Sequence, residues 1–513
     1  MSAGAESDLP GALEAWTRCL GSGSVTTDRD ALGALLADTV ARVVTVPAAL
    51  RPRSTEEVRA CMRVATAYRV ALYPSSRGCN WGLGTRTPPT PGCVLLDLSA
   101  LDRVRALDPS LGTVTVEPGV TFRALRALLE AEAPGFFLNV TGSSPDASVL
   151  GNLLDRGDGA GPYADRALHG CGFEAVLATG ELVHTGFARF QGTPLGAVHR
   201  WGVGPALDGL LSQGNLAVCT AGTVWLAPKP RALRVLRFTL AEERALPAAV
   251  EAVRALRLDG TLRGSCALWN DYRAVSTRAR FPRHRGDATT PLTREALRAW
   301  VGPVPRWEGT AGLYAQSEAV AAALEAHARS VLGPAVDTLT VVRAEGDPAG
   351  LFLTGAPHEE SLRSAWWRAP GEPPEEGLDP ARARCGVRWV CAAAPLTGEA
   401  VGLLVSVAEE TLLAYGFEPM LAVVTPQERA AHLVALVLFD RDAPGAEAQA
   451  LYAQEALQAS LATLGALPFR LAVDAPGALP AASDDYDSVL ARLKAALDPG
   501  GVLAPGRYQR AGR

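Results

Sequence analysis

Pro74-Ser-Ser-Arg-Gly-Cys-Asn-Trp-Gly-Leu-Gly84 is the stretch of this 513-residue chain on which the interpretation of the rest depends. It follows an apolar run, Val70–Tyr73, that we expect to form a β-strand. Gly78, Gly82 and Gly84 lie close together in it. Because glycine has no Cβ, its backbone can approach a ligand closely, and successive N–H groups of a turn form an anion-binding site. The stretch therefore predicts a strand that leads into a loop suited to a diphosphate.

Two later segments add small residues that carry hydrogen-bond donors, Gly142-Ser-Ser144 and Ser148-Val-Leu-Gly-Asn152. The pattern differs from two well-known nucleotide loops. No GxGxxG opens a helix with an acidic residue about 20 positions further on, and no GxxxxGK[ST] occurs. HExxH, GxSxG and kinase motifs are also absent. We therefore expect a set of glycine-containing turns that binds a dinucleotide outside the Rossmann and P-loop classes.

Composition excludes several other classes of protein. The net charge is −5, with 49 basic and 54 acidic residues and no basic stripe, so nucleic-acid binding is not expected. The longest apolar runs, such as Leu433–Phe439, are too short to cross a bilayer. The acidic N-terminus does not resemble a secretory signal, and we expect a cytoplasmic protein without membrane contact. The nine cysteines form no CxxC or zinc-finger spacing, so we expect reduced thiols and no metal site.

Local patterns predict alternating helices and strands. Ser54-Thr-Glu-Glu57 is a capping box that begins a helix with Val58, Met62 and Ala65 on one face. Thr121 is expected to cap a second helix. The expected extended segments are Ala41–Ala48, Cys93–Leu98, Thr113–Glu117, the hairpin Phe173–Ala178 with Leu182–Thr185, and Val218–Leu226, with a polar turn at Asp108-Pro109.

The pattern changes at about residue 231, where longer helices alternate with apolar strands. Ser317–Leu332 and Glu399–Tyr415 are the clearest predicted helices. Val434–Phe439 is continuously apolar, as expected for a strand covered on at least one face. Gly371–Gly377, rich in proline and glutamate, is expected to be an exposed loop.

These segments resemble, in order, those of the vanillyl-alcohol oxidase and p-cresol methylhydroxylase family of FAD-dependent oxidoreductases. Residues 74–84 resemble the loop that holds the flavin diphosphate, and 117–121 resemble the strand, turn and helix that follow. Ser148–Gly157 with Pro162–Asp165 is similar to the segment beneath the isoalloxazine. The remaining matching segments are 202–215, 225–228 and 498–506.

The resemblance covers nearly the whole chain and implies an α+β fold. It implies a FAD-binding domain of two subdomains in residues 1–230, completed by a C-terminal return in residues 475–513. Between them, residues 231–474 are expected to form an inserted α+β cap domain, in which helices cover an antiparallel sheet and which binds the substrate. The length of 513 residues agrees with two or three domains.

The resemblance implies FAD as cofactor and assigns its contacts. The expected cofactor-binding residues are Pro74, Ser75, Ser76, Arg77, Gly78, Cys79, Asn80, Trp81, Gly84, Pro118, Gly119, Thr141, Gly142, Ser144, Ser148, Val149, Gly151, Asn152, Asp155, Tyr163, Gly214, Asn215, Val218 and Arg507.

Many relatives bond FAD covalently to a histidine or tyrosine of the cap. Here the matching position falls at Val387 or Arg388, and neither side chain forms that bond. Cys385 is interpreted as a buried thiol in preference to a thioether, and His432 as a core histidine. We therefore favour FAD that is held without a covalent bond.

The expected catalytic positions depart from the family pattern. Relatives that oxidise 4-alkylphenols hold the phenolate with two tyrosines and an arginine; here those positions are Leu83, Phe469 and Arg470. The acidic position near the flavin is Ser143, with Asp146 three residues away. Since both hydroxyl donors are lost, Arg470 is expected to pair with a substrate carboxylate or to stabilise charge near the flavin.

Trp389 is the favoured pocket residue of the cap. Trp366, Trp367 and Asn270-Asp-Tyr272 also belong to segments that line the cavity in relatives, and packing is the alternative for each.

The function expected from the resemblance is removal of hydride from a benzylic or α C–H of a small aryl substrate, 4-hydroxyphenyl or tyrosine-derived. It would belong to secondary metabolism, with molecular oxygen as acceptor. Three alternatives stay open: oxidative decarboxylation of an acylated aryl amino acid to an alkene, a FAD-dependent 2-hydroxy-acid dehydrogenase, and a flavin-binding protein without catalysis. A homodimer stays open as the assembly.

Overall fold

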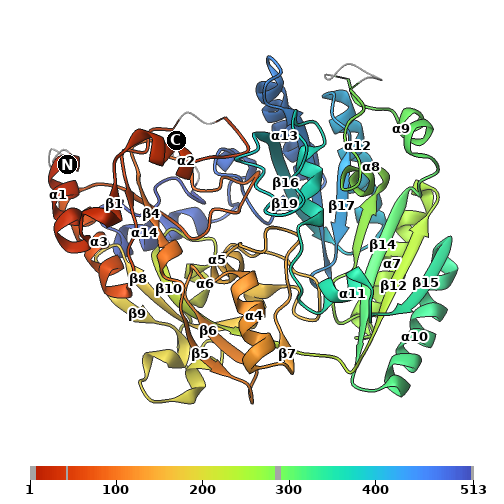
Figure 1. Cartoon of the computed structure of the whole chain (residues 1–513), viewed down its shortest axis with the longest axis horizontal. Helices are drawn as coiled ribbons and strands as arrows, with labels where there is room; N and C mark the ends of the chain where they lie inside the picture. Colours follow the sequence, from red (N-terminus) through yellow and green to blue (C-terminus); the bar gives the residue numbers. More distant parts are fainter. Residues whose placement is uncertain (1–6, 42–43, 284–289, 510–513) are drawn as a thin grey trace.

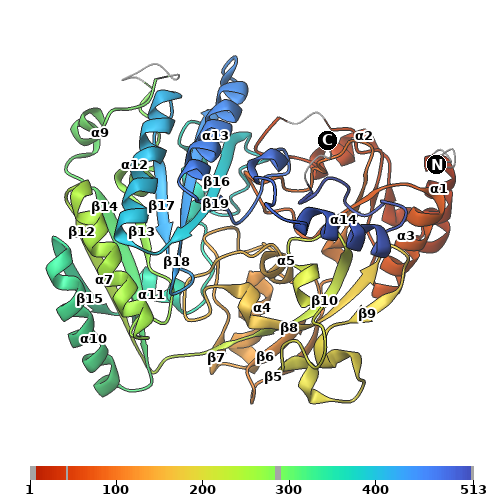
Figure 2. The ribbon, with the colours of Figure 1, turned by 180° about the vertical axis from the view of Figure 1, so that it is seen from behind.

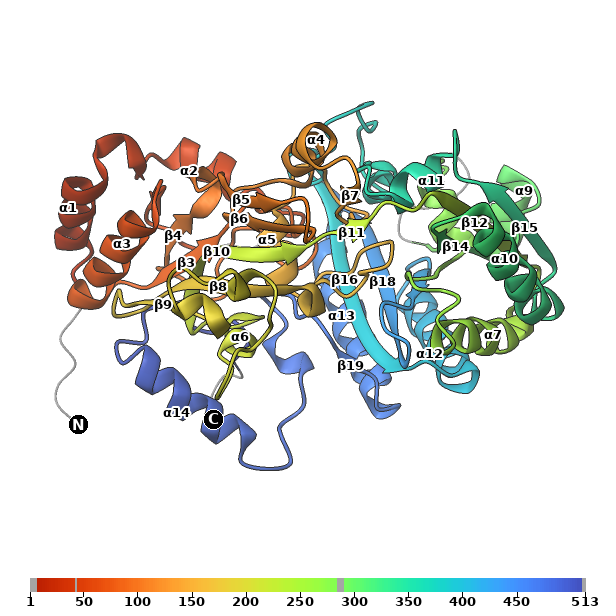
Figure 3. The ribbon, with the colours of Figure 1, turned by 90° about the horizontal axis from the view of Figure 1, so that it is seen from below.

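The computed structural model describes residues 7–41, 44–283 and 290–509. Figure 1 shows two parts side by side. The N-terminal part of the chain, from red to yellow, forms one of them, and the green-to-blue middle of the chain forms the other. The last helix, α14 (Tyr486–Leu497), returns to the N-terminal part, as Figures 2 and 3 both show. We call these parts the FAD half and the cap.

The first sheet of the FAD half has the order β1 (Val25–Thr26), β2 (Ala49–Leu50), β4 (Val94–Asp97), β3 (Leu72–Ser75). β4 is parallel to both of its neighbours. Leu503 forms a parallel bridge with Leu72, so the C-terminal segment extends this subdomain. The predicted extended segment 41–48 includes residues 42–43, which lie outside the described ranges; strand structure begins only at Ala49.

Helix α3 (Thr55–Tyr68) packs on this sheet and begins as the capping box predicts. The Ser54 hydroxyl accepts a hydrogen bond from the Glu57 N–H at 3.2 Å. The Glu57 carboxylate accepts from the N–H of Arg53, one residue before the expected Ser54, at 2.7 Å. Val58, Met62 and Ala65 are buried, which confirms the predicted apolar face.

The second sheet of the FAD half is antiparallel, with the order β5 (Val104–Asp108), β6 (Thr113–Val116), β10 (Ala217–Trp225), β8 (Gly170–Leu177), β9 (Leu182–His184). β5 was not expected, because its residues are exposed or half-buried and lack a clear alternation. The polar turn at Asp108-Pro109 therefore joins β5 to β6 rather than β4 to β6. Thr121 caps α4 (Phe122–Glu132) as predicted, accepting from the Ala124 N–H at 3.0 Å.

The cap is built on one antiparallel sheet. Its order is β15 (Thr338–Arg343), β12 (Ala232–Leu240), β14 (Trp307–Ala315), β13 (Ala267–Asn270), β17 (Met420–Val424), β18 (Ala430–Asp440), β16 (Cys385–Pro395), β19 (Leu467–Pro468). Figure 2 shows four helices along the outer face, α7 (Leu246–Leu258), α10 (Glu318–Leu332), α12 (Gly398–Ala414) and α13 (Ala446–Thr463).

Strand β18 explains the continuous apolar pattern of Val434–Phe439. Leu433, Ala435 and Val437 pack in the core beneath the outer helices, whereas Leu436 and Leu438 pack on the opposite face. Because both faces are covered, every position from Val434 to Phe439 is apolar.

The remaining elements are short or peripheral. They are α1 (Leu9–Leu20), α2 (Arg29–Leu35), β7 (Phe136–Phe137), α5 (Val149–Leu154), α6 (Asp208–Leu211), β11 (Ala227–Pro228), α8 (Asp271–Ser276), α9 (Arg294–Val301) and α11 (Pro348–Leu353). Within the described residues, no helix combines the length and the apolar character needed to span a membrane. The domain limits 230/231 and 474/475 stay predictions; the cap sheet extends from Ala232 to Pro468.

Asp38 provides a pH-dependent test of this packing. Its side chain is buried, and burial raises its pKa from 3.8 to about 6, although the Thr39 N–H donates to it at 2.7 Å and offsets part of the effect. Between these two values the folded state holds more protons than the unfolded state, so stability falls as the pH rises through this range. We expect Asp38→Asn to stabilise the protein at pH 8 by up to about 3 kcal/mol and to have little effect near pH 4.

Urea denaturation at the two pH values measures this difference. Asp102→Asn, at an exposed aspartate, is the control and should leave stability unchanged at both. A stabilisation by Asp38→Asn of equal size at both pH values would contradict the buried, proton-binding carboxyl.

Candidate active site

A cavity of about 1120 Å³ separates the FAD half from the cap. The FAD half contributes the end of β3, the loop after it, residues 141–143, and α5. The cap contributes the inner face of its sheet and the 3₁₀ segment η8 (Glu360–Trp366). Residues far apart in the sequence therefore meet around one space large enough for a dinucleotide and a second small molecule.

The loop after β3 presents unused backbone donors to this cavity. In the described structure, the N–H groups of residues 76–80 and of residues 142–144 donate to no protein acceptor. The loop is held from behind, since the Thr39 hydroxyl accepts from the Gly82 N–H at 2.9 Å. A Cβ on Gly151 would lie 2.5 Å from the Ser76 hydroxyl, so α5 approaches the loop in a way that only glycine permits. Unpaired N–H groups along a cavity wall fit an anionic diphosphate.

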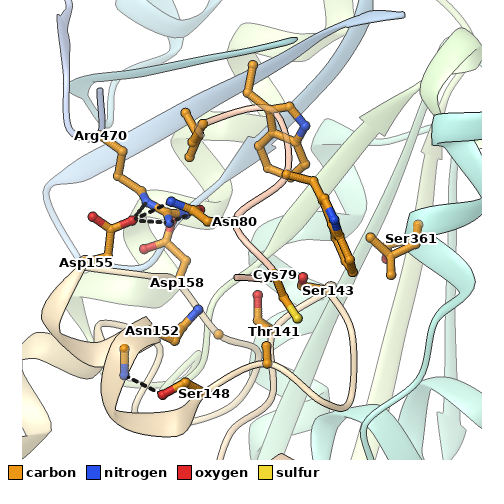
Figure 4. A pocket seen from close by; sticks show the side chains of 18 of the residues that line it. Cys79, Asn80, Thr141, Ser143, Ser148, Asn152, Asp155, Asp158, Ser361 and Arg470 are labelled. Carbon is orange, nitrogen blue, oxygen red and sulfur yellow. Dashed lines mark hydrogen bonds and ion pairs between the residues drawn. The ribbon is translucent and has the colours of Figure 1, made fainter. Parts of the chain in front are cut away.

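A charged cluster stands beside this loop. Arg470 donates to the Asp155 carboxylate at 2.5 Å and to the side-chain amide oxygen of Asn80 at 2.7 Å. Tyr508 donates to the same carboxylate at 2.7 Å, and Arg507 lies 3.6 Å from it. Burial raises the pKa of Asp155, but the attraction of Arg470 and Arg507 outweighs it, and the pKa is lowered overall. Figure 4 shows Arg470, Asp155 and Asn80 together on one side of the pocket.

The cluster gives Arg470 a carboxylate of the protein as its partner. The sequence predicts that Arg470 pairs with a substrate carboxylate or stabilises charge near the flavin, and both roles stay predictions. Asp155 is 315 positions away along the chain, and nothing in the local sequence indicates the pairing.

The other predicted catalytic residues all line the cavity: Leu83, Ser143, Trp389 and Phe469. A Cβ on Gly82 would lie 2.3 Å from Cδ1 of Trp389, so the loop and the cap touch directly there. The Trp389 indole N–H is buried and has no partner among the described residues. It is therefore a donor available to a bound molecule. Asp146, the alternative to Ser143, is instead paired with Arg123 at 3.0 Å.

His432 behaves as the predicted core histidine. It lies 2.6 Å from the Asp158 carboxylate, and its ring stacks on Phe469 with centroids 3.7 Å apart. Asp158 and Phe469 line the cavity. His432 thus supports the wall from behind.

Most predicted cofactor residues also line the cavity. They are Pro74, Ser75, Ser76, Arg77, Gly78, Cys79, Asn80, Trp81, Pro118, Thr141, Gly142, Ser148, Gly151, Asn152, Asp155, Gly214, Val218 and Arg507. The Ser148 hydroxyl has a structural task as well, because it donates to the Pro118 carbonyl at 2.6 Å and accepts from the Gly151 N–H at 2.8 Å.

Six predicted cofactor residues do not line the cavity: Gly84, Gly119, Ser144, Val149, Tyr163 and Asn215. The Val149 side chain is fully buried in the core. Tyr163 stacks on His169 with centroids 4.1 Å apart. Asn215 donates to the Ala504 carbonyl at 3.5 Å. Ser148, Leu150 and Gly214, next to Val149 and Asn215, do line the cavity, whereas no residue of Pro162–Asp165 does.

The other three of the six shape turns. The Gly119 N–H donates to the Leu101 carbonyl at 2.6 Å, and the Ser144 hydroxyl accepts from the Asp146 N–H at 3.1 Å. Gly84, with φ +114°, faces Val473, where a Cβ would lie 2.2 Å from a methyl group. Each fixes the backbone behind the cavity wall.

In the cap, several candidate pocket residues turn out to be core. Trp366, Trp367 and Tyr272 are almost completely buried away from the cavity, and the Asn270 amide donates to the Pro419 carbonyl at 2.6 Å. Of the residues at the linking position, Val387 lines the cavity, whereas Arg388 forms ion pairs with Glu447 and Asp474.

The cysteines near the linking position are protonated thiols. Burial raises the pKa of Cys385 to about 12, and its side chain lies in the cap core outside the cavity. Cys391 does line the cavity, and burial raises its pKa to about 12 as well. Neither forms a thiolate at neutral pH. Attachment of FAD without a covalent bond stays a prediction.

Sequence patterns did not indicate the wall that the cap contributes. Trp269, Arg273, Ser361 and His358 line it, and they come from β13, α8, η8 and the loop before η8. No motif connects these short segments. Figure 4 shows Ser361 across the pocket from the Arg470 cluster.

The comparisons with known proteins agree with this architecture. The family described as "FAD binding domain" matches residues 46–186. The chain is 40% identical to 1'-carboxy-chondrochloren decarboxylase of Chondromyces crocatus, over 98% of this chain and 97% of that protein. It is 26% identical to the flavoprotein subunit of 4-cresol dehydrogenase (hydroxylating) of Pseudomonas putida, over 90% and 87% of the two chains.

Solved structures show the same fold. Substrate-bound p-cresol methylhydroxylase superimposes with a TM-score of 0.88 at 23% identity, covering 97% of this chain and 96% of that one. The isoeugenol complex of 4-ethylphenol oxidase from Gulosibacter chungangensis gives a TM-score of 0.89 at 23% identity, covering 98% and 97%.

The fold, the cavity and these similarities define an FAD-dependent oxidoreductase. The chain belongs to the vanillyl-alcohol oxidase and p-cresol methylhydroxylase family. The predicted α+β fold, with a FAD-binding part and an antiparallel cap sheet covered by helices, is confirmed.

Proposed function

We propose that this protein is an FAD-dependent oxidative decarboxylase of an aryl-substituted carboxylic acid, such as an acylated aryl amino acid. The observation that carries the proposal is the end-to-end similarity, at 40% identity, to a relative whose name describes a decarboxylase of a carboxylated compound. The apolar residues at the phenolate-binding positions support it, because Leu83 and Phe469 offer no hydroxyl donors to a simple phenolate.

The cavity suits the cofactor and a substrate at once. In our proposal the amides of residues 76–80 and 142–144 bind the diphosphate, and Arg470 with Asp155 lies beside the flavin. Bound FAD supplies an acceptor for a hydride from carbon. Leu83, Phe469 and Trp389 form a wall that excludes water from the reacting carbon and orients the aryl group.

The proposed reaction breaks two bonds of the substrate. The benzylic C–H bond breaks, and hydride leaves with both electrons. The bond from the neighbouring carbon to its carboxylate breaks as well, and its electron pair becomes the new C=C bond while carbon dioxide leaves. Molecular oxygen finally takes up the two electrons, the transferred hydrogen and one proton from solvent, and is reduced to hydrogen peroxide. The products are an alkene, carbon dioxide and hydrogen peroxide.

The test is product analysis by mass spectrometry after aerobic incubation with N-acyl-tyrosines of different acyl length. We expect a product lighter than the substrate by one carbon dioxide and two hydrogen atoms. A product that keeps the carboxylate and gains oxygen would instead support simple benzylic oxidation, the second candidate, which the similarity to 4-cresol dehydrogenase favours.

The remaining alternatives have weaker support. Relatives named for glycolate or D-lactate match only 37% and 46% of this chain. Among the described residues, no group of three His, Cys, Asp or Glu side chains is placed to hold a metal ion, as the histidine cluster of such dehydrogenases would require. A flavin-binding protein without catalysis would show no product with any aryl acid that perturbs its absorption spectrum.

A further inference from the structure

The arginines that line the cavity differ in how their charges are balanced. Arg237 lies 2.6 Å from the Asp347 carboxylate, and Arg278 lies 3.4 Å from the Glu308 carboxylate. Arg470 and Arg507 share Asp155. Each of these four therefore has a carboxylate of the protein within reach.

Arg273 has none. No Asp or Glu among the described residues forms an ion pair with it, although the residue is only 5% exposed. Arg77, the remaining arginine of the cavity without such a pair, is partly exposed and belongs to the predicted diphosphate loop. Arg273 is thus the buried, uncompensated positive charge of the cap wall. Burying such a charge is costly unless a ligand or partner balances it.

The surroundings of Arg273 hold its guanidinium in place with neutral groups. One terminal nitrogen donates to the Ser364 hydroxyl, and the other donates to the Ser361 carbonyl at 3.3 Å. The guanidinium carbon lies 4.6 Å from the centre of the Trp269 ring. Burial alone lowers its pKa to about 10, so it stays charged at neutral pH.

This end of the cavity adjoins the predicted flavin site. A Cβ on Gly142 would lie 2.9 Å from the Ser361 hydroxyl, so η8 touches the loop whose amides are unused. Figure 4 shows Ser361 near Ser143 and far from the Arg470 cluster. An aryl acid bound between Ser361 and the Arg470 cluster would have the Arg273 guanidinium as an anion-binding group on the cap side.

We infer that Arg273 binds the carboxylate of the substrate. The inference rests on the proposed function, because it names the group that recognises the acid to be decarboxylated. Ser361 and Ser364 position the guanidinium, and Trp269 covers one face of it. A planar arginine fork suits a carboxylate, and charge-assisted hydrogen bonds in a buried site are strong.

The test uses binding and does not require turnover. 3-Methyl-3-phenylbutanoate has no hydrogen on its benzylic carbon and cannot be oxidised there; its carboxamide is the neutral match. Titration of the FAD-loaded protein, followed by perturbation of flavin absorbance, gives the dissociation constant of each. We expect the acid to bind more tightly than the amide, and Arg273→Met to weaken acid binding by about 10- to 100-fold while leaving amide binding nearly unchanged.

Two variants control for folding and for general charge. Arg273→Lys keeps the positive charge but lacks the planar guanidinium with its paired donors. It should retain part of the preference for the acid. Arg278→Gln removes a paired, more exposed arginine of the same cavity and should change acid binding less than threefold. Without ligand, Arg273→Met should melt at the same temperature as the original protein or higher, since no carboxylate loses its partner.

An Arg273→Met protein that is folded and binds FAD but keeps the full preference for the acid would overturn the inference. Failure of the proposed decarboxylation alone would give another result. The preference for the acid would still depend on Arg273, but no carbon dioxide would form from any N-acyl-tyrosine.

Discussion

Replacing Asp155 with asparagine is expected to destabilise the protein by about 3 kcal/mol and to remove most of its bound FAD and activity. Asp155 accepts from Arg470 at 2.5 Å and from Tyr508 at 2.7 Å, and Arg507 lies 3.6 Å away. The neutral amide leaves two largely buried cations without a counter-charge, next to the loop at Asn80. Thermal and urea unfolding, with FAD content measured by absorbance, check this.

The pH dependence of this effect differs from that of Asp38. The lowered pKa of Asp155 means that its stabilising contribution is present above its ordinary value of 3.8 and is lost only as the pH falls through the depressed value. The deficit of Asp155→Asn should therefore be constant between pH 5 and pH 8. Asp442→Asn, which breaks an exposed ion pair with Arg384, is the control and should cost less than about 1 kcal/mol.

The second large effect is expected from Gly82→Ala. Gly82 has φ +74°, and an added Cβ would lie 2.3 Å from Cδ1 of Trp389. The indole has to move, and it does so at the wall that we propose for the aryl group. Displacement of a positioning group by about 1 Å lowers catalysis by about 100-fold. We expect a comparable loss in kcat/KM, measured by product formation.

Gly92→Ala is the control that separates the effect of backbone strain from the effect of displacing Trp389. Gly92 has a similar φ, +82°, but an added Cβ meets nothing within 4 Å. It should cost about 1 kcal/mol of stability from the left-handed backbone and leave kcat/KM unchanged. Equal losses of activity in the two variants would show that the contact between Gly82 and Trp389 does not matter.

Much of the fold could be predicted because its signals are local. Ser54 and Thr121 cap the helices expected of them, since a cap requires only residues within one turn. The continuous apolar run of β18 predicts a covered strand in the same way. Strand β5 was missed because its half-exposed residues carry no alternation.

The site was predictable only where one segment forms it. Residues 74–81 line the cavity as one continuous segment, so their glycines and small side chains identify the loop. Arg470 was assigned to the substrate because its partner, Asp155, is far away in sequence. Arg273 was missed because its setting combines β13, α8 and η8, and the Ser364 that holds it is 91 positions away. Pairings of this kind arise from tertiary packing alone.

The most direct measurement of the central claim is an anaerobic single turnover of the FAD-loaded protein with an N-acyl-tyrosine labelled with ¹³C at the carboxylate. Flavin reduction is followed by absorbance and labelled carbon dioxide by mass spectrometry. We expect one carbon dioxide to be released for each flavin reduced, with the alkene as organic product. Full reduction of the flavin with the labelled carboxylate still in the product would contradict it.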